Sequence, residues 1–276
     1  MPTNILPPNE AAPCVLFLFA HNDDELFVLP KIKQEVAQGA DVWCIYTTDG
    51  AAYGACPEER LNESVKVLSS CGVQSAHIIP LGAATACRDG RAHLSIGTLY
   101  SSIDEVTHQL RLARIYTLAW EGGHHDHDTT HLIARKLSLQ RGDIPLFEFS
   151  AYHGHRMPAP LFDCMNFLPS TILTTTCLGQ LSEEKRTLSL RESIGWFRRF
   201  LSYPTQRKTL LALAPICFIR IVVQRTERVR RVEDYSYLEP PHEGRLLYER
   251  LFGVTFEQFV QATHSFIATM GTDRLN

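Results

Sequence analysis

The sequence lacks several features that would assign it at once to a large class of proteins. Its 276 residues carry a net charge of −3, so we expect no general attraction to nucleic acid or to an anionic membrane. No apolar run approaches the roughly 20 residues that span a bilayer. Residues 1–13 lack a basic stretch followed by a long apolar core, so they do not read as a secretory signal. We expect a cytoplasmic protein that binds neither nucleic acid nor membrane.

The cysteines and glycines also lack the spacings of common binding motifs. The eight cysteines form no C-x-x-C pair, which argues against a four-cysteine zinc site and fits a reducing compartment. The turn at 20–26 is acidic and contains no glycine, so it does not suit the phosphates of a dinucleotide. Without repeats or low-complexity tracts, and with 45% hydrophobic residues, the chain is expected to fold as a globular protein.

The first half of the chain alternates short apolar runs with segments of helical spacing. The strands expected from these runs are 14–20, 41–48, 76–82, 114–120 and 144–152. The helices expected between them are 24–39, 57–72, 97–112 and 128–142. Continuous apolar strands that alternate with helices are typical of a parallel sheet covered on both faces. The predicted fold is α/β, a Rossmann-like three-layer arrangement with a mostly parallel sheet.

The alternation ends near residue 150. Helical spacing is found over 183–203, 244–253 and 255–270, whereas 214–225 reads as a strand. The expected organisation has three parts: an N-terminal extension over 1–13, a Rossmann-like catalytic core over 14–150, and a C-terminal elaboration over 151–276. This elaboration is expected to pack on the core and to shape the substrate pocket.

Acids and histidines gather directly after the predicted strands, where parallel sheets bind ligands. His21 and Asp24 follow the first strand, and their i, i+3 spacing puts them on one side of a turn. His124 and His127 repeat that spacing after the fourth strand. Two histidines and one carboxylate are a normal ligand set for catalytic zinc, so we assign His21, Asp24 and His127 as ligands. Fe²⁺ could occupy the same set.

The neighbouring side chains suggest roles around such a metal. Asp23 is placed to accept a proton from water. His124 could stabilise an oxyanion or protonate the leaving nitrogen, and Asp126 could hold the tautomer of a neighbouring imidazole. Asp49 follows the second strand and either lines the pocket floor or serves only as a turn residue. Glu25 is expected to be structural.

Two motifs resemble those of a known family. "AHNDDE" at 20–25 and "HHDH" at 124–127 are similar to the AHPDDE and HPDH motifs of PIG-L/LmbE-like N-acetylglucosaminyl deacetylases, with Asn22 and His125 at the usual proline positions. "RLNE" at 60–63 fits the family's R-x-x-E, and "YPTQ" at 203–206 looks like a later family segment.

The resemblance implies a zinc-dependent enzyme that removes the N-acetyl group of an amino sugar, for example a secondary-metabolite or aminoglycoside-like intermediate. It implies that Asp23 is the general base, that His21, Asp24 and His127 bind zinc, and that Arg60 contacts the small-molecule substrate.

Several alternatives stay open at this point. The same chemistry would serve a metallo-amidase that acts on a larger sugar conjugate, and a Rossmann-like module could bind a sugar without turnover. An HD-type phosphohydrolase is disfavoured because a strand precedes Glu121. The sequence does not decide whether four further histidines enter the site: His125, His131, His153 and His155. Nor does it decide the oligomeric state.

Overall fold

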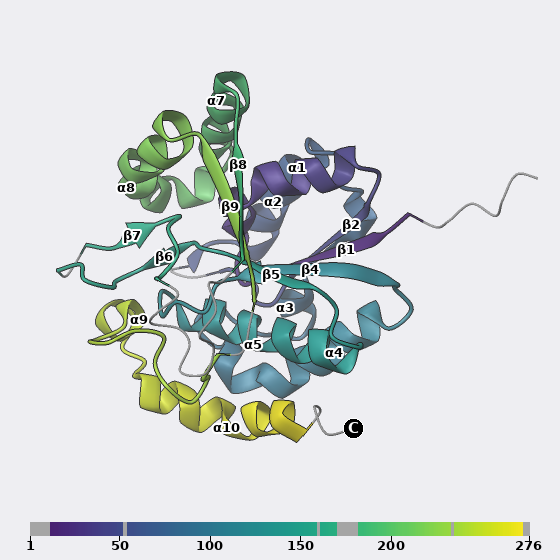
Figure 1. Cartoon of the computed structure of the whole chain (residues 1–276), viewed down its shortest axis with the longest axis vertical. Coiled ribbons are helices and arrows are strands. Elements are labelled where there is room, and N and C mark those ends of the chain that lie inside the picture. Colours follow the sequence, from purple (N-terminus) through teal and green to yellow (C-terminus); the bar gives the residue numbers. More distant parts are fainter. Residues whose placement is uncertain (1–11, 52–53, 159–160, 170–181, 233–234, 273–276) are drawn as a thin grey trace, which may run out of the picture.

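The computed structural model describes residues 12–51, 54–158, 161–169, 182–232 and 235–272. A seven-stranded sheet with the strand order β3-β2-β1-β4-β5-β9-β8 forms its centre (Figure 1). The strands are β1 Cys14–Phe19, β2 Asp41–Tyr46, β3 Ile78–Ile79, β4 Leu112–Leu118, β5 Leu146–Phe149, β8 Glu183–Thr187 and β9 Thr226–Arg231. The first five are parallel, and β9 and β8 continue the sheet in antiparallel pairing. The predicted α/β fold with a mostly parallel sheet is confirmed.

Helices cover both faces of this sheet (Figure 1). They are α1 Leu29–Ala37, α2 Pro57–Ser69, α3 Leu81–Ala84, α4 Ile96–Thr107, α5 His125–Gln140, α7 Leu190–Arg198, α8 Arg207–Phe218, α9 Leu247–Leu251 and α10 Phe256–Thr272. One apolar core joins the sheet to α1, α2, α7 and α8, and a second joins it to α3, α4, α5 and α10. Phe17 and Phe19 of β1 enter the first core, whereas Leu16 and Leu18 enter the second. This burial on both faces explains the continuous apolar run of β1.

Proline and glycine mark the ends of α1 and α2, although α1 begins at Leu29 and not at the expected residue 24. Pro30 lies in the first turn of α1 and Pro57 opens α2, where the missing N–H costs no intrahelical bond. Gly39 and Gly72 follow these helices with φ of 84° and 96°, a conformation that glycine adopts without strain.

The order of the strands reverses beside β1. The chain first builds β2 and β3 on one side of β1, and it then returns to add β4 on the other side. Leu18 of β1 pairs with Thr117 of β4, so the two strands end next to each other. The turns that follow β1 and β4 therefore meet at the topological switch point, where open α/β sheets bind ligands.

The predictions for the second half were partly wrong. Residues 214–225, expected as a strand, form the end of α8 and a π-helical turn, Ile219–Val223, and the strand β9 follows them. A short apolar run fits a buried strand and a helix equally well, so periodicity could not decide. Residues 183–187, expected as the start of a helix, form β8 on the sheet edge through its pairing with β9. The expected strand 144–152 is divided between β5 and β6 Tyr152–His153, which pairs with β7 Asp163–Cys164.

Candidate metal centre and catalytic site

The turn after β1 has a strained backbone at Asp23. This residue has φ of 129° and ψ of −15°, a region that costs a non-glycine residue about 1–3 kcal/mol. Asp24 Oδ2 accepts hydrogen bonds from the backbone N–H groups of Ala20 and His21, at 2.9 and 2.8 Å. The turn therefore fixes the carboxylate of Asp24 and the imidazole of His21 next to each other.

Other elements hold the same turn in place. Glu25 accepts a hydrogen bond from the backbone N–H of Asp23 at 3.0 Å and another from the hydroxyl of Tyr203 at 2.6 Å. The guanidinium of Arg60 on α2 donates to the carbonyl oxygen of Asn22 at 2.5 Å. Strained turns persist where the surroundings over-determine them, and they cluster at functional sites. Glu25 thus has the structural contacts that the sequence analysis expected.

Three candidate ligand residues converge beside this turn. His21 Nδ1 lies 3.2 Å from His127 Nε2, which lies 3.2 Å from Asp24 Oδ1, and His21 Nδ1 lies 3.7 Å from Asp24 Oδ2. A tetrahedral ion with bonds of 2.0–2.1 Å places its ligands about 3.3 Å apart. All three side chains are buried. Burial raises the pKa of Asp24, but the two imidazoles lower it well below its usual range, so this residue is a carboxylate. The group fits a divalent metal ion.

His124 caps the N-terminus of α5, and its Nδ1 accepts the backbone N–H of Asp126 at 3.1 Å. Burial and the neighbouring His21 lower the pKa of His124 well below its usual value. The ring is therefore neutral, and because Nδ1 accepts, its proton is on Nε2.

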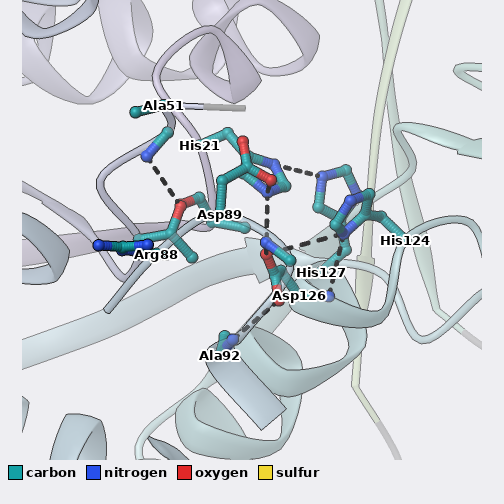
Figure 2. A network of polar contacts seen from close by, with 12 residues as sticks. His21, Ala51, Arg88, Asp89, Ala92, His124, Asp126 and His127 are labelled. Carbon is teal, nitrogen blue, oxygen red and sulfur yellow. Dashed lines mark hydrogen bonds and ion pairs between the residues drawn. The ribbon is translucent and has the colours of Figure 1, made fainter. Parts of the chain in front are cut away.

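Asp126 ties the start of α5 to the loop that precedes η4 (Ala92–Ser95). Its Oδ2 accepts the backbone N–H of Gly90 at 2.6 Å and lies 3.2 Å from His21 Nε2, and its Oδ1 accepts the N–H of Ala92 at 3.0 Å (Figure 2). Burial raises the pKa of this carboxyl, but the imidazoles of His21 and His124 lower it below its usual range. Asp126 thus contacts the imidazole of His21.

The same loop brings in Asp89, which sequence reasoning missed. Its Oδ1 lies 3.4 Å from His21 Nε2 (Figure 2). Its Oδ2 lies 3.7 Å from Arg60. Burial raises the pKa of Asp89, but His21 more than offsets this and brings it to about 2. Asp49 Oδ1 accepts the backbone N–H groups of Asp89 and Ala51, so Asp49 holds this loop. The "RDGR" segment reads as an ordinary turn, and only the fold carries its aspartate to the site.

Asp23 is more accessible than the three ligand candidates. Its side chain is 17% exposed and lies 3.3 Å from the guanidinium of Arg60. Burial raises its pKa to about 7, although Arg60 opposes the shift. A carboxyl with such a pKa can take up and release protons near neutrality.

The remaining histidines have separate places. His125 donates from Nε2 to the carbonyl oxygen of Gly90 at 2.9 Å and packs edge-on against His93. His131 contacts Leu118 O and the hydroxyl of Tyr237, inside the core.

His153 and His155 have contacts of their own. His153 contacts the carbonyl oxygen of Asn166 at 2.9 Å. His155 packs against His242.

Part of the chain matches a known protein family. Residues 16–138, which run from β1 to α5 and contain both motifs, match the PIG-L family, described as GlcNAc-PI de-N-acetylase. Over these residues the chain resembles the PIG-L family. No curated protein matches the chain significantly.

Solved structures share the fold of this chain. The deacetylase of the antimicrobial A40926 pseudoaglycone has 18% identity and a TM-score of 0.55, over 80% of this chain and 98% of its own. A teicoplanin-pathway deacetylase has 17% identity and a TM-score of 0.54, over 80% and 99%. The N,N'-diacetylchitobiose deacetylase of Pyrococcus horikoshii has 15% identity and a TM-score of 0.51, over 80% and 84%. At these identities the likeness shows the fold.

Among the described residues, no helix has both the length and the apolar character needed to cross a membrane.

Proposed function

We propose that this protein is a metal-dependent hydrolase that removes the N-acetyl group from an N-acetylated amino sugar. The observation that carries the proposal is the convergence of His21, Asp24 and His127 beside the accessible carboxyl of Asp23. Zn²⁺ is the metal we propose, with Fe²⁺ as the alternative for the same ligands. A metal ion held there would supply the Lewis-acid chemistry that activates water and polarises the amide carbonyl.

Asp23 is the proposed general base. Its pKa of about 7 lets it take a proton from the attacking water and deliver it to the leaving nitrogen within one turnover. Arg60, at 3.3 Å, sets this basicity, because a nearby cation favours the carboxylate form.

His124 is the proposed hydrogen-bond donor to the oxyanion. Its Nδ1 accepts the backbone N–H of Asp126, so the protonated Nε2 is the nitrogen left to donate. A neutral donor fixed by a helix cap needs no reorganisation during the reaction. Asp126 acts by orienting the imidazole of His21, and it also holds the loop that carries Asp89.

Substrate recognition is proposed for Arg60 and, through the loop that it holds, for Asp49. Both face Asp89, whose charged oxygens suit the hydroxyl groups of a sugar. We further propose that residues 14–150 form the catalytic core and that 151–276 shape the pocket. The A40926, teicoplanin and chitobiose deacetylases support an amino sugar as substrate, and two of them support a place in antibiotic biosynthesis. A cytoplasmic location remains part of the proposal.

The test is acetate release from a panel of N-acetylated amino sugars, with protein of known metal content, with and without a chelator. We expect a chelator to abolish release and zinc to restore it. Asp23→Ala should keep the metal and lose turnover, whereas His21→Ala should lose both. His264→Ala, which removes an exposed histidine of α10, is the control and should behave as wild type. Full turnover in Asp23→Ala would remove the assigned base.

A further inference from the structure

Exposed apolar side chains gather in one part of the molecule, residues 190–225, which we name the α7–α8 lobe. Eleven large apolar side chains are exposed among the described residues, and seven of them belong to this lobe. They are Leu190, Ile194, Leu201, Leu211, Phe218, Ile219 and Val223, with exposed fractions between 43% and 78%. Figure 1 shows α7 and α8 together at one end of the molecule, opposite α10. Clusters of this kind mark interaction surfaces.

Four of these side chains, Ile194, Leu211, Phe218 and Ile219, form a connected surface. Leu211, Phe218 and Ile219 are spaced i, i+7 and i+8 along α8 and the π-helical turn, so they share one face. The ring of Phe218 packs edge-on against that of Phe197 of α7, with centroids 5.4 Å apart. Phe197 lies one turn beyond Ile194 on the same helix, so this contact joins the exposed faces of the two helices.

The charge around this surface has one sign. The lobe contains seven basic side chains and one acidic side chain, Glu192, in a chain whose net charge is −3. Five of the basic side chains are exposed and form no ion pair with any described residue. They are Arg191, Arg198, Arg207, Lys208 and Arg225. The expectation that the chain does not attract anionic membranes came from its net charge, which hides this local excess.

We propose that the α7–α8 lobe docks on the surface of an anionic lipid membrane. Exposed Leu, Ile and Phe side chains insert at the headgroup boundary of a bilayer, and the surrounding Arg and Lys side chains bind anionic headgroups. A second copy of the chain fits less well, because a symmetric pairing would bring the two basic rims together. The proposal rests on the lobe alone and does not depend on the proposed deacetylase activity.

Hydrogen bonds connect the α7–α8 lobe directly to the turn that carries Asp23. The indole of Trp196 donates to the carbonyl oxygen of Leu26 at 2.6 Å, and Tyr203 donates to Glu25 at 2.6 Å. Thr205 donates to Glu63 of α2 at 2.5 Å. A membrane held by the lobe would therefore lie beside the elements that build the candidate site.

The test is co-sedimentation of the full chain with sonicated vesicles, either of phosphatidylcholine alone or with about 30% phosphatidylglycerol. We expect binding to the anionic vesicles, which increasing salt weakens. The double substitution Arg207→Glu/Lys208→Glu should reduce this binding at least about twentyfold, since each cation near an anionic surface contributes about fivefold. The double substitution Leu211→Ser/Ile219→Ser should also reduce vesicle binding, because it removes two apolar side chains that insert at the headgroup boundary.

Matched controls place the same changes elsewhere on the surface. Leu94→Ser/Leu238→Ser removes two exposed leucines outside the lobe and should leave vesicle binding unchanged. Sedimentation without lipid tests whether a second copy of the chain, and not a membrane, covers the α7–α8 lobe. A dimer that Leu211→Ser/Ile219→Ser dissociates, with no vesicle binding, would overturn the proposal in favour of a second copy. Equal losses in the lobe and control variants, or no binding to anionic vesicles at low salt, would also overturn it.

Discussion

Arg60 should set the pH at which Asp23 becomes an active base. Its guanidinium, 3% exposed, lies 3.3 Å from the Asp23 carboxylate, where two unit charges attract by about 5 kcal/mol at an effective dielectric constant of 20. Reorganisation of the surrounding protein and water offsets part of this attraction. A neighbouring Arg therefore lowers the pKa of an Asp by about 1–3 units. Arg60→Met should therefore raise the pKa of Asp23, now about 7, by about 1–3 units.

The assay is the pH dependence of kcat/KM for acetate release. A base acts in its deprotonated form, so the acidic limb of the profile should move to higher pH in Arg60→Met. At neutral pH the variant should lose about five- to five-hundredfold in rate, because wild-type Asp23 is itself only about half deprotonated there, and part of this loss should return at alkaline pH. Loss of a substrate contact would instead lower the rate equally at every pH, which separates the two roles of Arg60.

Arg60→Lys is the matched control, because it keeps the charge and loses the planar fork. Its acidic limb should lie close to that of wild type. Thermal unfolding and metal content should accompany each profile, since Arg60 also donates to Asn22 O in the strained turn. An acidic limb in folded, metal-loaded Arg60→Met that coincides with wild type would refute the reasoning.

Three further predictions concern other parts of the fold. His125→Phe removes the donor to the loop that carries Asp89, so KM should rise several-fold with metal content unchanged, and His125→Gln should restore much of it. Burial raises the pKa of Glu227 from 4.5 to about 7. The folded state therefore holds its proton more tightly, and stability falls as the pH rises from about 4.5 to 7. Glu227→Gln should remove a destabilisation on the order of 3 kcal/mol above pH 7 and change little at pH 4, as denaturant titrations at both pH values would show. A Cβ at Gly123 would lie 1.9 Å from a backbone carbonyl oxygen, so Gly123→Ala should cost at least about 2 kcal/mol in urea unfolding, whereas Gly97→Ala, with open space, should cost nothing.

Each of these predictions has an outcome that would contradict it. If the KM of His125→Gln stayed as high as that of His125→Phe, the imidazole ring, and not its N–H donor, would determine KM. An equal effect of Glu227→Gln at both pH values would show that the carboxyl does not titrate between them. Wild-type stability of Gly123→Ala would show that the neighbouring strand can move.

The sequence alone determined the parallel part of the sheet and the place of the site. The strands of the first half are buried on both faces, so they appear in the sequence as continuous apolar runs. Between them lie segments whose apolar residues recur with the 3.6-residue period of a helix. These two patterns predict the fold without any tertiary information. The carboxyl ends of parallel strands share one edge, which is why His21, Asp24 and His127 could be expected near one another although 106 residues separate the two histidines. Short local signals, such as Pro57 at the start of α2, set the helix limits.

Tertiary structure decided what local patterns could not. Residues 214–225 carry an apolar run that suits a strand or a helix, and packing of α8 against α7 and the sheet selected the helix. The sequence of β8 has no alternation of apolar and polar residues. It is a strand because its backbone pairs antiparallel with the edge of β9. Asp89 lies in a turn of ordinary composition and reaches the site only because Asp49 and Asp126 hold its loop. The basic, apolar surface of the α7–α8 lobe is likewise visible only once the fold separates its exposed residues from its buried ones, because composition averages over both.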